Sequence, residues 1–149
     1  MNKTLDETLV TRYPLIFSNR YKSPSETLMC FGFECGDGWF EIIDILCRQI
    51  QHHIDFNLKR RELFSKSAHQ GSDIVIPNIE QVVAVQVKEK FGTLRFYYDG
   101  GDDYILGAVS MAEAMSTSIC ETCGKPGKLY TNEWWYVACD DHVKEKDKK

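Results

Sequence analysis

The sequence lacks several features that mark particular classes of protein. It contains no uninterrupted apolar run near the length of about 18 residues that a membrane-spanning helix requires. Its N-terminal residues do not show the charged and then apolar pattern of a secretory leader. We therefore expect a soluble, cytoplasmic protein that has no membrane partner.

The sequence also lacks the cysteine pattern of a disulfide framework. Six cysteines are present among 149 residues, and three of them belong to the C-terminal pattern discussed below. The remaining three, Cys30, Cys35 and Cys47, are an odd number. Small secreted domains instead use dense, even sets of cysteines. The cysteine content therefore fits a reducing compartment.

An excess of positive charge is missing as well. The net charge is −4, and the last six residues, with four Lys, one Glu and one Asp, contribute +2, so the rest of the chain is near −6. Because a nucleic-acid backbone requires a basic surface, DNA binding is disfavoured. We expect a single domain over residues 1–143, followed by a disordered lysine-rich tail over residues 144–149.

Two close pairs of metal-binding residues are present near the C-terminus. Cys120 and Cys123 form the first pair, and after fifteen residues Cys139 and His142 form the second. Two such pairs can surround one tetrahedral Zn²⁺, and four protein ligands leave no open position for catalysis. We predict one structural Zn²⁺ in a zinc-ribbon-like hairpin within residues 118–143, whose strands are 128–131 and 134–138.

Other interpretations of the first cysteine pair are a redox site, a catalytic metal site or no metal at all. A thioredoxin-like redox pair begins a helix and requires no second Cys/His pair. Here Gly124, Pro126 and Gly127 disfavour a helix after Cys123. The composition of the segment therefore favours the structural metal site.

Hydrophobic periodicity predicts the remaining elements. We expect a short helix over residues 5–12 capped by Thr4, a strand over 29–35, and a β-hairpin over 83–98 with its turn at 89–92. Residues 65–78 have the composition of a loop. In the hairpin, the odd-numbered valines 83, 85 and 87 are expected on the core face.

Two longer helices complete the prediction. The first spans 38–58 with Asp37 as its N-cap and one apolar stripe, formed by Trp39, Ile42, Ile43, Leu46, Cys47, Ile50 and Ile54. The second spans 103–117 with Asp102 as its cap, and its stripe consists of Ile105, Ala108, Val109, Ala112 and Met115. The predicted fold class is α+β, with a small antiparallel β-sheet packed with two main helices and the C-terminal hairpin packed against the second of them.

Three segments together resemble an uncharacterised family of small bacteriophage and prophage proteins. They are residues 31–39 (FGFECGDGW), residues 85–97 (VQVKEKFGTLRFY) and the C-terminal Cys and His pairs, so the resemblance covers about residues 13–143. It implies a phage setting, the host cytoplasm as the location, and a host macromolecule as the partner. Accessory proteins of phages often block host enzymes or host defences.

The functional hypotheses follow from a closed metal site, an acidic body and several aromatic residues. We expect a non-enzymatic protein that binds and blocks or sequesters a host protein, and the oligomeric state is left open. One alternative is a nucleotide-sequestering protein whose site is lined by Trp39, Lys88, Arg95 and Tyr97. Another is a zinc-ribbon regulator that binds nucleic acid through the ribbon and the tail. An enzyme with Cys35 as its nucleophile is a further alternative. The candidate binding residues are Trp39, Lys88, Lys90, Arg95, Tyr97, Trp134 and Trp135.

Overall fold

The computed structural model describes residues 1–66 and 76–147, so most of the predicted loop 65–78 lies outside the described residues. The α-helices are α1 (Lys3–Arg12), α2 (Phe40–Lys66) and α3 (Asp103–Ser116). The strands are β1 (Phe33–Glu34), β2 (Glu80–Lys90), β3 (Thr93–Gly101), β4 (Lys128–Tyr130) and β5 (Tyr136–Ala138). Three short 3₁₀ helices are η1 (Leu28–Phe31), η2 (Asp37–Trp39) and η3 (Glu145–Asp147).

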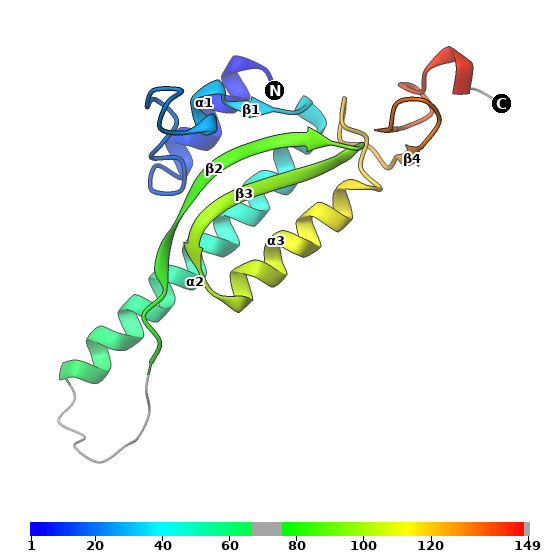
Figure 1. The fold of residues 1–149 in the computed structure, drawn as a ribbon. Helices are drawn as coiled ribbons and strands as arrows, with labels where there is room; N and C mark the ends of the chain where they lie inside the picture. The colour runs from blue at the N-terminus through cyan, green and yellow to red at the C-terminus, as the bar shows by residue number, and fades with distance from the viewer. Residues whose placement is uncertain (67–75, 148–149) are drawn as a thin grey trace.

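The elements form the predicted α+β fold around one small sheet. In Figure 1 the β2–β3 hairpin lies over α2, α3 runs beside β3, and the C-terminal end lies beyond the tip of the hairpin. The sheet is mixed and not purely antiparallel, because β1 pairs in parallel with β2 while β2 and β3 are antiparallel. Strands β4 and β5 form a separate antiparallel pair. The fold class is confirmed, and the strand direction of β1 is the correction.

Helix α2 provides the longest part of the core. All seven residues of its predicted apolar stripe are buried, as the 3.6-residue period requires. The helix continues to Lys66, eight residues beyond the predicted end, because the basic residues 59–61 are followed by further helix-compatible residues and no Gly or Pro. Asp37 does not act as its cap. The Asp37 carboxylate instead accepts hydrogen bonds from the backbone and side-chain nitrogens of Asn2.

The first helix has a different cap from the predicted one. Asn2 occupies the N-cap position of α1, and its side-chain oxygen accepts a hydrogen bond from the amide of Leu5 at 3.1 Å. The predicted cap, Thr4, lies inside the first turn. Asn and Thr are both good cap residues, so the local sequence alone does not decide between them. The additional bonds from Asn2 to Asp37 favour the earlier start.

The segment predicted as a strand over residues 29–35 is mostly not extended. Residues 28–31 form η1, whose cap Thr27 accepts a hydrogen bond from the amide of Met29. Gly32 then has a φ of +78°, a conformation that favours glycine, and only Phe33 and Glu34 pair with β2. The tight turn and the positive φ at Gly32 explain why alternation of residue type was misleading here.

A β-bulge changes which residues of β2 face the core. Ala84 pairs with Tyr98, whereas Gln86 pairs with Tyr97, so one additional residue, Val85, is inserted in β2. The insertion reverses the alternation, so Val82, Ala84 and Val87 are buried, while positions 83 and 85 are only partly buried. The predicted odd-numbered face was therefore correct only at Val87.

Helix α3 begins at the predicted cap and protects the free edge of the sheet. Asp102 accepts a hydrogen bond from the amide of Ile105 at 3.1 Å. In the last turn of α3, Ser116 and Glu113 accept hydrogen bonds from the outward amides of Leu94 and Phe96 in β3, both at 2.9 Å. Of the predicted stripe, Ile105, Val109 and Ala112 are buried, Ala108 is partly buried, and Met115 is about half exposed.

Replacing the cap residue of α3 is expected to destabilise the fold measurably. Asp102→Ala removes the acceptor for the Ile105 amide and the partner of His53, whose Nε2 lies 2.9 Å from Asp102 Oδ2. We expect the free energy of unfolding in urea at neutral pH to fall by about 1–2 kcal/mol. Asp103→Ala, in the first turn but not at the cap, is the control and should change it by at most about 0.5 kcal/mol. Equal effects of the two variants would contradict the capping role.

The difference in free energy of unfolding between the wild type and Asp102→Ala should become smaller in acid. Partial burial raises the pKa of Asp102, but the hydrogen bonds from His53 and Ile105 outweigh burial and hold the pKa below its usual value of 3.8. A carboxylate whose pKa is lowered by folding stabilises the fold above its unfolded pKa, and the contribution is lost as the pH falls through the folded pKa. Asp102→Ala and the wild type should therefore become more alike below about pH 4.

Candidate functional site

The four predicted ligands converge at the C-terminal end of the chain. The candidate ligand atoms of Cys120, Cys123, Cys139 and His142 all lie within 4.8 Å of one another. The turn after Cys123 is completed by Gly124, whose φ is +78°. The β4–β5 hairpin carries the second pair to the first, and the two strands are in register from Lys128–Ala138 to Tyr130–Tyr136. The predicted hairpin is confirmed, although its second strand is two residues shorter.

The distances fit a tetrahedral metal ion. A zinc–sulfur bond of about 2.3 Å places two sulfurs of a tetrahedron about 3.8 Å apart. Cys123 Sγ and Cys139 Sγ are 3.7 Å apart, and Cys120 Sγ lies 3.7 Å from His142 Nδ1. Cys139 Sγ and His142 Nδ1 are closer, at 3.2 Å. Three sulfurs and one imidazole nitrogen at these separations can hold one metal ion.

The environment of the first cysteine favours a metal-binding thiolate. Burial of Cys120 raises the pKa of its thiol, but hydrogen bonds from the backbone amides of Cys139, Cys123 and Thr122 outweigh burial and lower the pKa to about 6. A hydrogen bond from the Lys125 backbone lowers the pKa of the Cys123 thiol, but desolvation and the neighbouring sulfurs of Cys139 and Cys120 together outweigh it and raise the pKa. Thiolates are the ligands that soft and borderline metals prefer.

Hydrogen bonds connect the segment that carries the four candidate ligands, residues 118–142, to the residues just before α2. The amide of Gly38 donates to the carbonyl of Glu121 at 2.8 Å, and the amide of Gly36 donates to the carboxylate of the same Glu121 at 2.9 Å. Trp39 Nε1 donates to the carbonyl of Ile119 at 2.9 Å. The prediction placed the C-terminal hairpin against the second helix. These bonds instead connect the metal-binding end to residues 36–39.

The C-terminal end also contacts the tip of the sheet. Phe91 and Gly92 form the two-residue turn between β2 and β3, with φ values of +53° and +72°. The ring of Phe91 meets Trp135 edge to face, with ring centroids 6.2 Å apart. A side chain at position 92 would collide with Leu129 and Tyr136. The metal-binding end, residues 118–147, thus contacts the body of the protein, residues 1–116, at two places. One is residues 36–39 and the other is the β2–β3 turn.

The first residues of the tail contact the β4–β5 hairpin and its loop. Residues 145–147 form η3, and Asp147 accepts hydrogen bonds from Tyr136 and Asn132, both at 2.6 Å. Lys146 forms an ion pair with Glu133. These contacts explain why a polar segment packs here. Residues 148–149 lie outside the described residues.

The predicted binding residues lie in three separate environments. Trp39 is fully buried in the core, so it lines no surface. Lys88 and Arg95 are opposite each other on β2 and β3, with Lys88 Nζ 5.7 Å from the centre of the Tyr97 ring. Arg95 also lies 3.8 Å from Glu113 of α3. The remaining candidates lie near the β2–β3 turn, and they are Lys90, Trp134 and Trp135.

An aromatic cleft lies at the junction between the sheet and the metal-binding end. It has a volume of about 460 Å³ and is lined by Glu89, Phe91, Glu133, Trp134 and Trp135. Phe91, Trp134 and Trp135 are 64%, 70% and 45% exposed, which is unusual for three large aromatic residues that lie together. Sequence reasoning identified both tryptophans but missed Phe91 and the two glutamates. A Phe-Gly pair at a two-residue turn is the signal that could have indicated Phe91.

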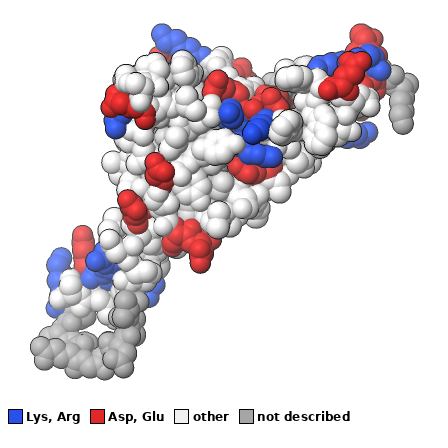
Figure 2. Space-filling model, in the orientation of Figure 1, with Lys and Arg blue, Asp and Glu red and all other residues white. Residues whose placement is uncertain are grey.

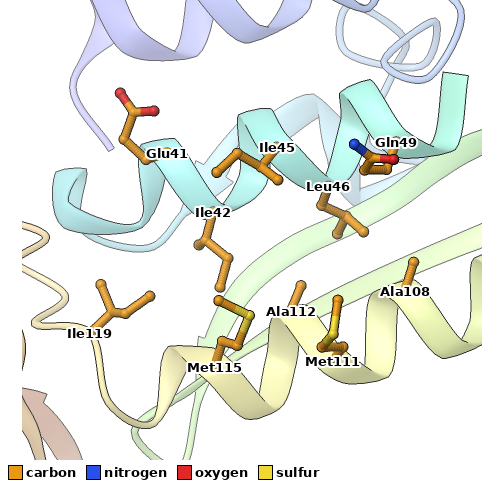
Figure 3. Close-up of a pocket in the computed structure, with 10 residues that line it drawn as sticks. All are labelled: Glu41, Ile42, Ile45, Leu46, Gln49, Ala108, Met111, Ala112, Met115 and Ile119. Atoms are coloured by element: carbon orange, nitrogen blue, oxygen red, sulfur yellow. The ribbon is translucent and has the colours of Figure 1, made fainter. Parts of the chain in front are cut away.

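A second apolar hollow lies between α2 and α3. Figure 3 shows Ile42 and Met115 pointing toward each other across it, with Met111 on the preceding turn of α3. Its volume is about 160 Å³ and its lining is almost entirely apolar. Met115 lines this hollow, which agrees with its exposure, because no side chain of the described residues fills the space between the two helices at this point. Met111 is 62% exposed and serves below as a control position.

The remaining candidate chemistry finds little support in the described residues. Burial raises the pKa of the Cys35 thiol to about 12, so this residue is a poor nucleophile at neutral pH. On the face shown in Figure 2, acidic and basic side chains are interspersed and leave much of the surface uncharged. That face therefore shows no basic stripe for a nucleic-acid backbone among the described residues.

Comparison with protein-family models, curated proteins and solved structures gives no match. Among the described residues, no helix is long and apolar enough to cross a membrane.

Proposed function

We propose that the chain is a non-enzymatic, phage-type accessory protein that binds a host protein through the aromatic cleft and blocks or sequesters it. One structural Zn²⁺ holds the half of the cleft that carries Trp134 and Trp135. The observation that carries the proposal is the exposure of these two side chains beside Phe91. Tryptophan and other large aromatic residues contribute most to binding energy at protein interfaces.

The way in which the cleft is assembled supports this function. The aromatic residues are on two elements that do not follow each other in sequence, the β2–β3 turn and the β4–β5 loop. The metal ligands Cys120, Cys123, Cys139 and His142 close the base of that loop. A binding surface that is ordered before its partner arrives loses less conformational entropy on association. A structural metal is therefore useful to a small binding protein.

Zinc is the metal that best fits the donor set. Three thiolates and one imidazole form a well-known structural Zn²⁺ set, and four protein ligands leave no position for water or substrate. The metal would fix the loop and take part in no reaction. This role agrees with the absence of a solvent-accessible activated nucleophile at Cys35.

The two alternatives have weaker support than protein binding. A nucleotide site that includes Trp39 conflicts with the burial of this residue, and Arg95 lies beside the carboxylate of Glu113. A nucleic-acid site on the ribbon and tail would use Lys146, which is paired with Glu133. Phosphate groups would also approach the two glutamates of the cleft.

The proposal predicts that capture of a partner depends on the cleft. In cross-linking pull-downs from a bacterial lysate, the wild-type chain should enrich a specific protein, and Trp134→Ala should reduce that enrichment by at least about tenfold, as for a hot-spot residue. Met111→Ala removes an equally exposed apolar side chain from the other hollow and should leave capture unchanged. Equal enrichment by the wild type and Trp134→Ala would contradict the proposal.

A further inference from the structure

We infer that the aromatic cleft accepts an arginine side chain of the protein partner, an inference that rests on the proposed function. Three aromatic rings and two carboxylates line the cleft, and no cationic side chain is among its lining residues. The faces of aromatic rings attract cations, and tryptophan attracts them most strongly. The lining is therefore complementary to a positively charged group.

The arrangement of the cleft favours arginine over a compact ammonium group. Phe91 and Trp135 meet at an interplanar angle of 66°, so their rings form a corner and not a flat stack. A planar guanidinium can lie against one ring while its edge donates hydrogen bonds to a carboxylate. Glu89 comes from the end of β2 and Glu133 from the β4–β5 loop, so carboxylates from both of these elements line the cleft.

Two lysines of the chain already contact residues that line the cleft. Lys90 Nζ lies 5.5 Å from the centre of the Phe91 ring, and Lys146 pairs with Glu133. Both contacts show that the rim of the cleft attracts cations. The Glu133 side chain is 80% exposed, and exposed ion pairs contribute little free energy. An incoming guanidinium can therefore replace Lys146 at small cost.

Glu89 is positioned for this role by the hairpin itself. One oxygen of its carboxylate accepts a hydrogen bond from the amide of Gly92 at 2.5 Å, which fixes the side chain across the β2–β3 turn. A neutral amide at position 89 can preserve this hydrogen bond while removing the charge. Glu89→Gln is therefore a variant that changes the electrostatics and keeps the turn.

The test uses a matched pair of short peptides on the zinc-loaded full chain. The first is acetyl-Gly-Gly-Arg-Gly-Gly-amide, and the second contains citrulline, which has a similar shape and no charge. Binding is followed through the indole N–H resonances of Trp134 and Trp135. We expect the arginine peptide to bind with a Kd on the order of 1–10 mM, and the citrulline peptide to bind at least about tenfold more weakly. Equal binding of the two peptides would overturn the inference.

Two variants sharpen the test in opposite directions. The double variant Glu89→Gln/Glu133→Gln should weaken binding of the arginine peptide by at least about fivefold. Lys146→Met removes the internal competitor and should tighten binding by about threefold, whereas Lys3→Met, at a distant exposed ion pair with Glu7, should not change it. Unchanged affinity in the first two variants would count against the inference.

The inference and the proposed function can fail separately. If partner capture is lost in Trp134→Ala but several millimolar arginine peptide causes no change in the indole resonances, the cleft is a protein-binding site and the inference that it binds arginine is wrong. If the arginine peptide binds but partner capture does not depend on Trp134, the cleft does bind arginine and the proposed function is wrong. Stronger binding of a lysine peptide than of the arginine peptide would also refute the preference argued from the planar geometry.

Discussion

Removal of the metal is expected to unfold the C-terminal end while the body stays folded. The core cluster of buried residues is formed by side chains between Leu9 and Ala112, so the body does not need the metal ligands for its own packing. The ligated end has few other sources of stability, and binding of structural Zn²⁺ contributes about 10 kcal/mol or more in small zinc domains. Chelation, or the variant Cys139→Ser, should therefore move the backbone resonances of residues 118–147 toward random-coil positions.

The measurement combines metal analysis with NMR of the chelated and zinc-loaded chain. One equivalent of zinc per chain is expected in the wild type, and much less in Cys139→Ser. Cys30→Ser is the matched control, because Cys30 lies outside the ligand set and should leave zinc content and spectra unchanged. A metal-free chain that retains the native resonances of residues 118–147 would refute the structural role.

Substituting alanine for Gly38 should be among the most damaging single changes. A methyl group at this position would collide with backbone atoms of Cys120, Cys123 and Gly124. Backbone of the metal-binding turn cannot move aside without disturbing the ligands, so overpacking here should cost about 3 kcal/mol. We expect Gly38→Ala to lower the free energy of unfolding by this amount and to weaken zinc binding.

Gly107 provides the matched control for that substitution. It lies on the exposed side of α3, and an added Cβ would meet nothing within 4 Å. Alanine has a higher helix propensity than glycine, so Gly107→Ala should raise the free energy of unfolding by about 0.5–1 kcal/mol. Urea denaturation measures both variants. Similar destabilisation by the two would show that the close approach at Gly38 is not what matters.

Local periodicity was sufficient to predict the parts of the fold whose residues interact with near neighbours in sequence. The apolar stripe of α2, the β2–β3 hairpin, the Asp102 cap and the two close pairs of candidate metal ligands depend on spacings of a few residues within each feature, and the structure places each of them as expected. These features are encoded in a pattern that can be seen without knowledge of the fold.

The errors at the α1 cap, at residues 28–32 and at the end of α2 are local, whereas the others concern contacts between separate segments. The bulge at Val85 reverses one strand face, and no local pattern announces it. The hydrogen bonds from Gly36 and Gly38 to Glu121 join residues that are more than 80 positions apart, so the placement of the metal-binding end could not be deduced from helix or strand periodicity. The cleft was only half predicted for the same reason, since Phe91 reaches Trp135 through the fold and not through the chain.

The hydrogen bonds along the sides of the sheet have a consequence for self-association. Ser116 and Glu113 already accept from the outward amides of β3, and on the opposite side the amide of Ala84 donates to the carbonyl of Ile16 at 2.7 Å. Another strand would have to displace these groups before it could pair there, and such pairing is how edge strands lead to fibrils. Two tryptophans of this protein are exposed to solvent. The hydrogen bonds at the sides of the sheet oppose polymerisation through the sheet itself.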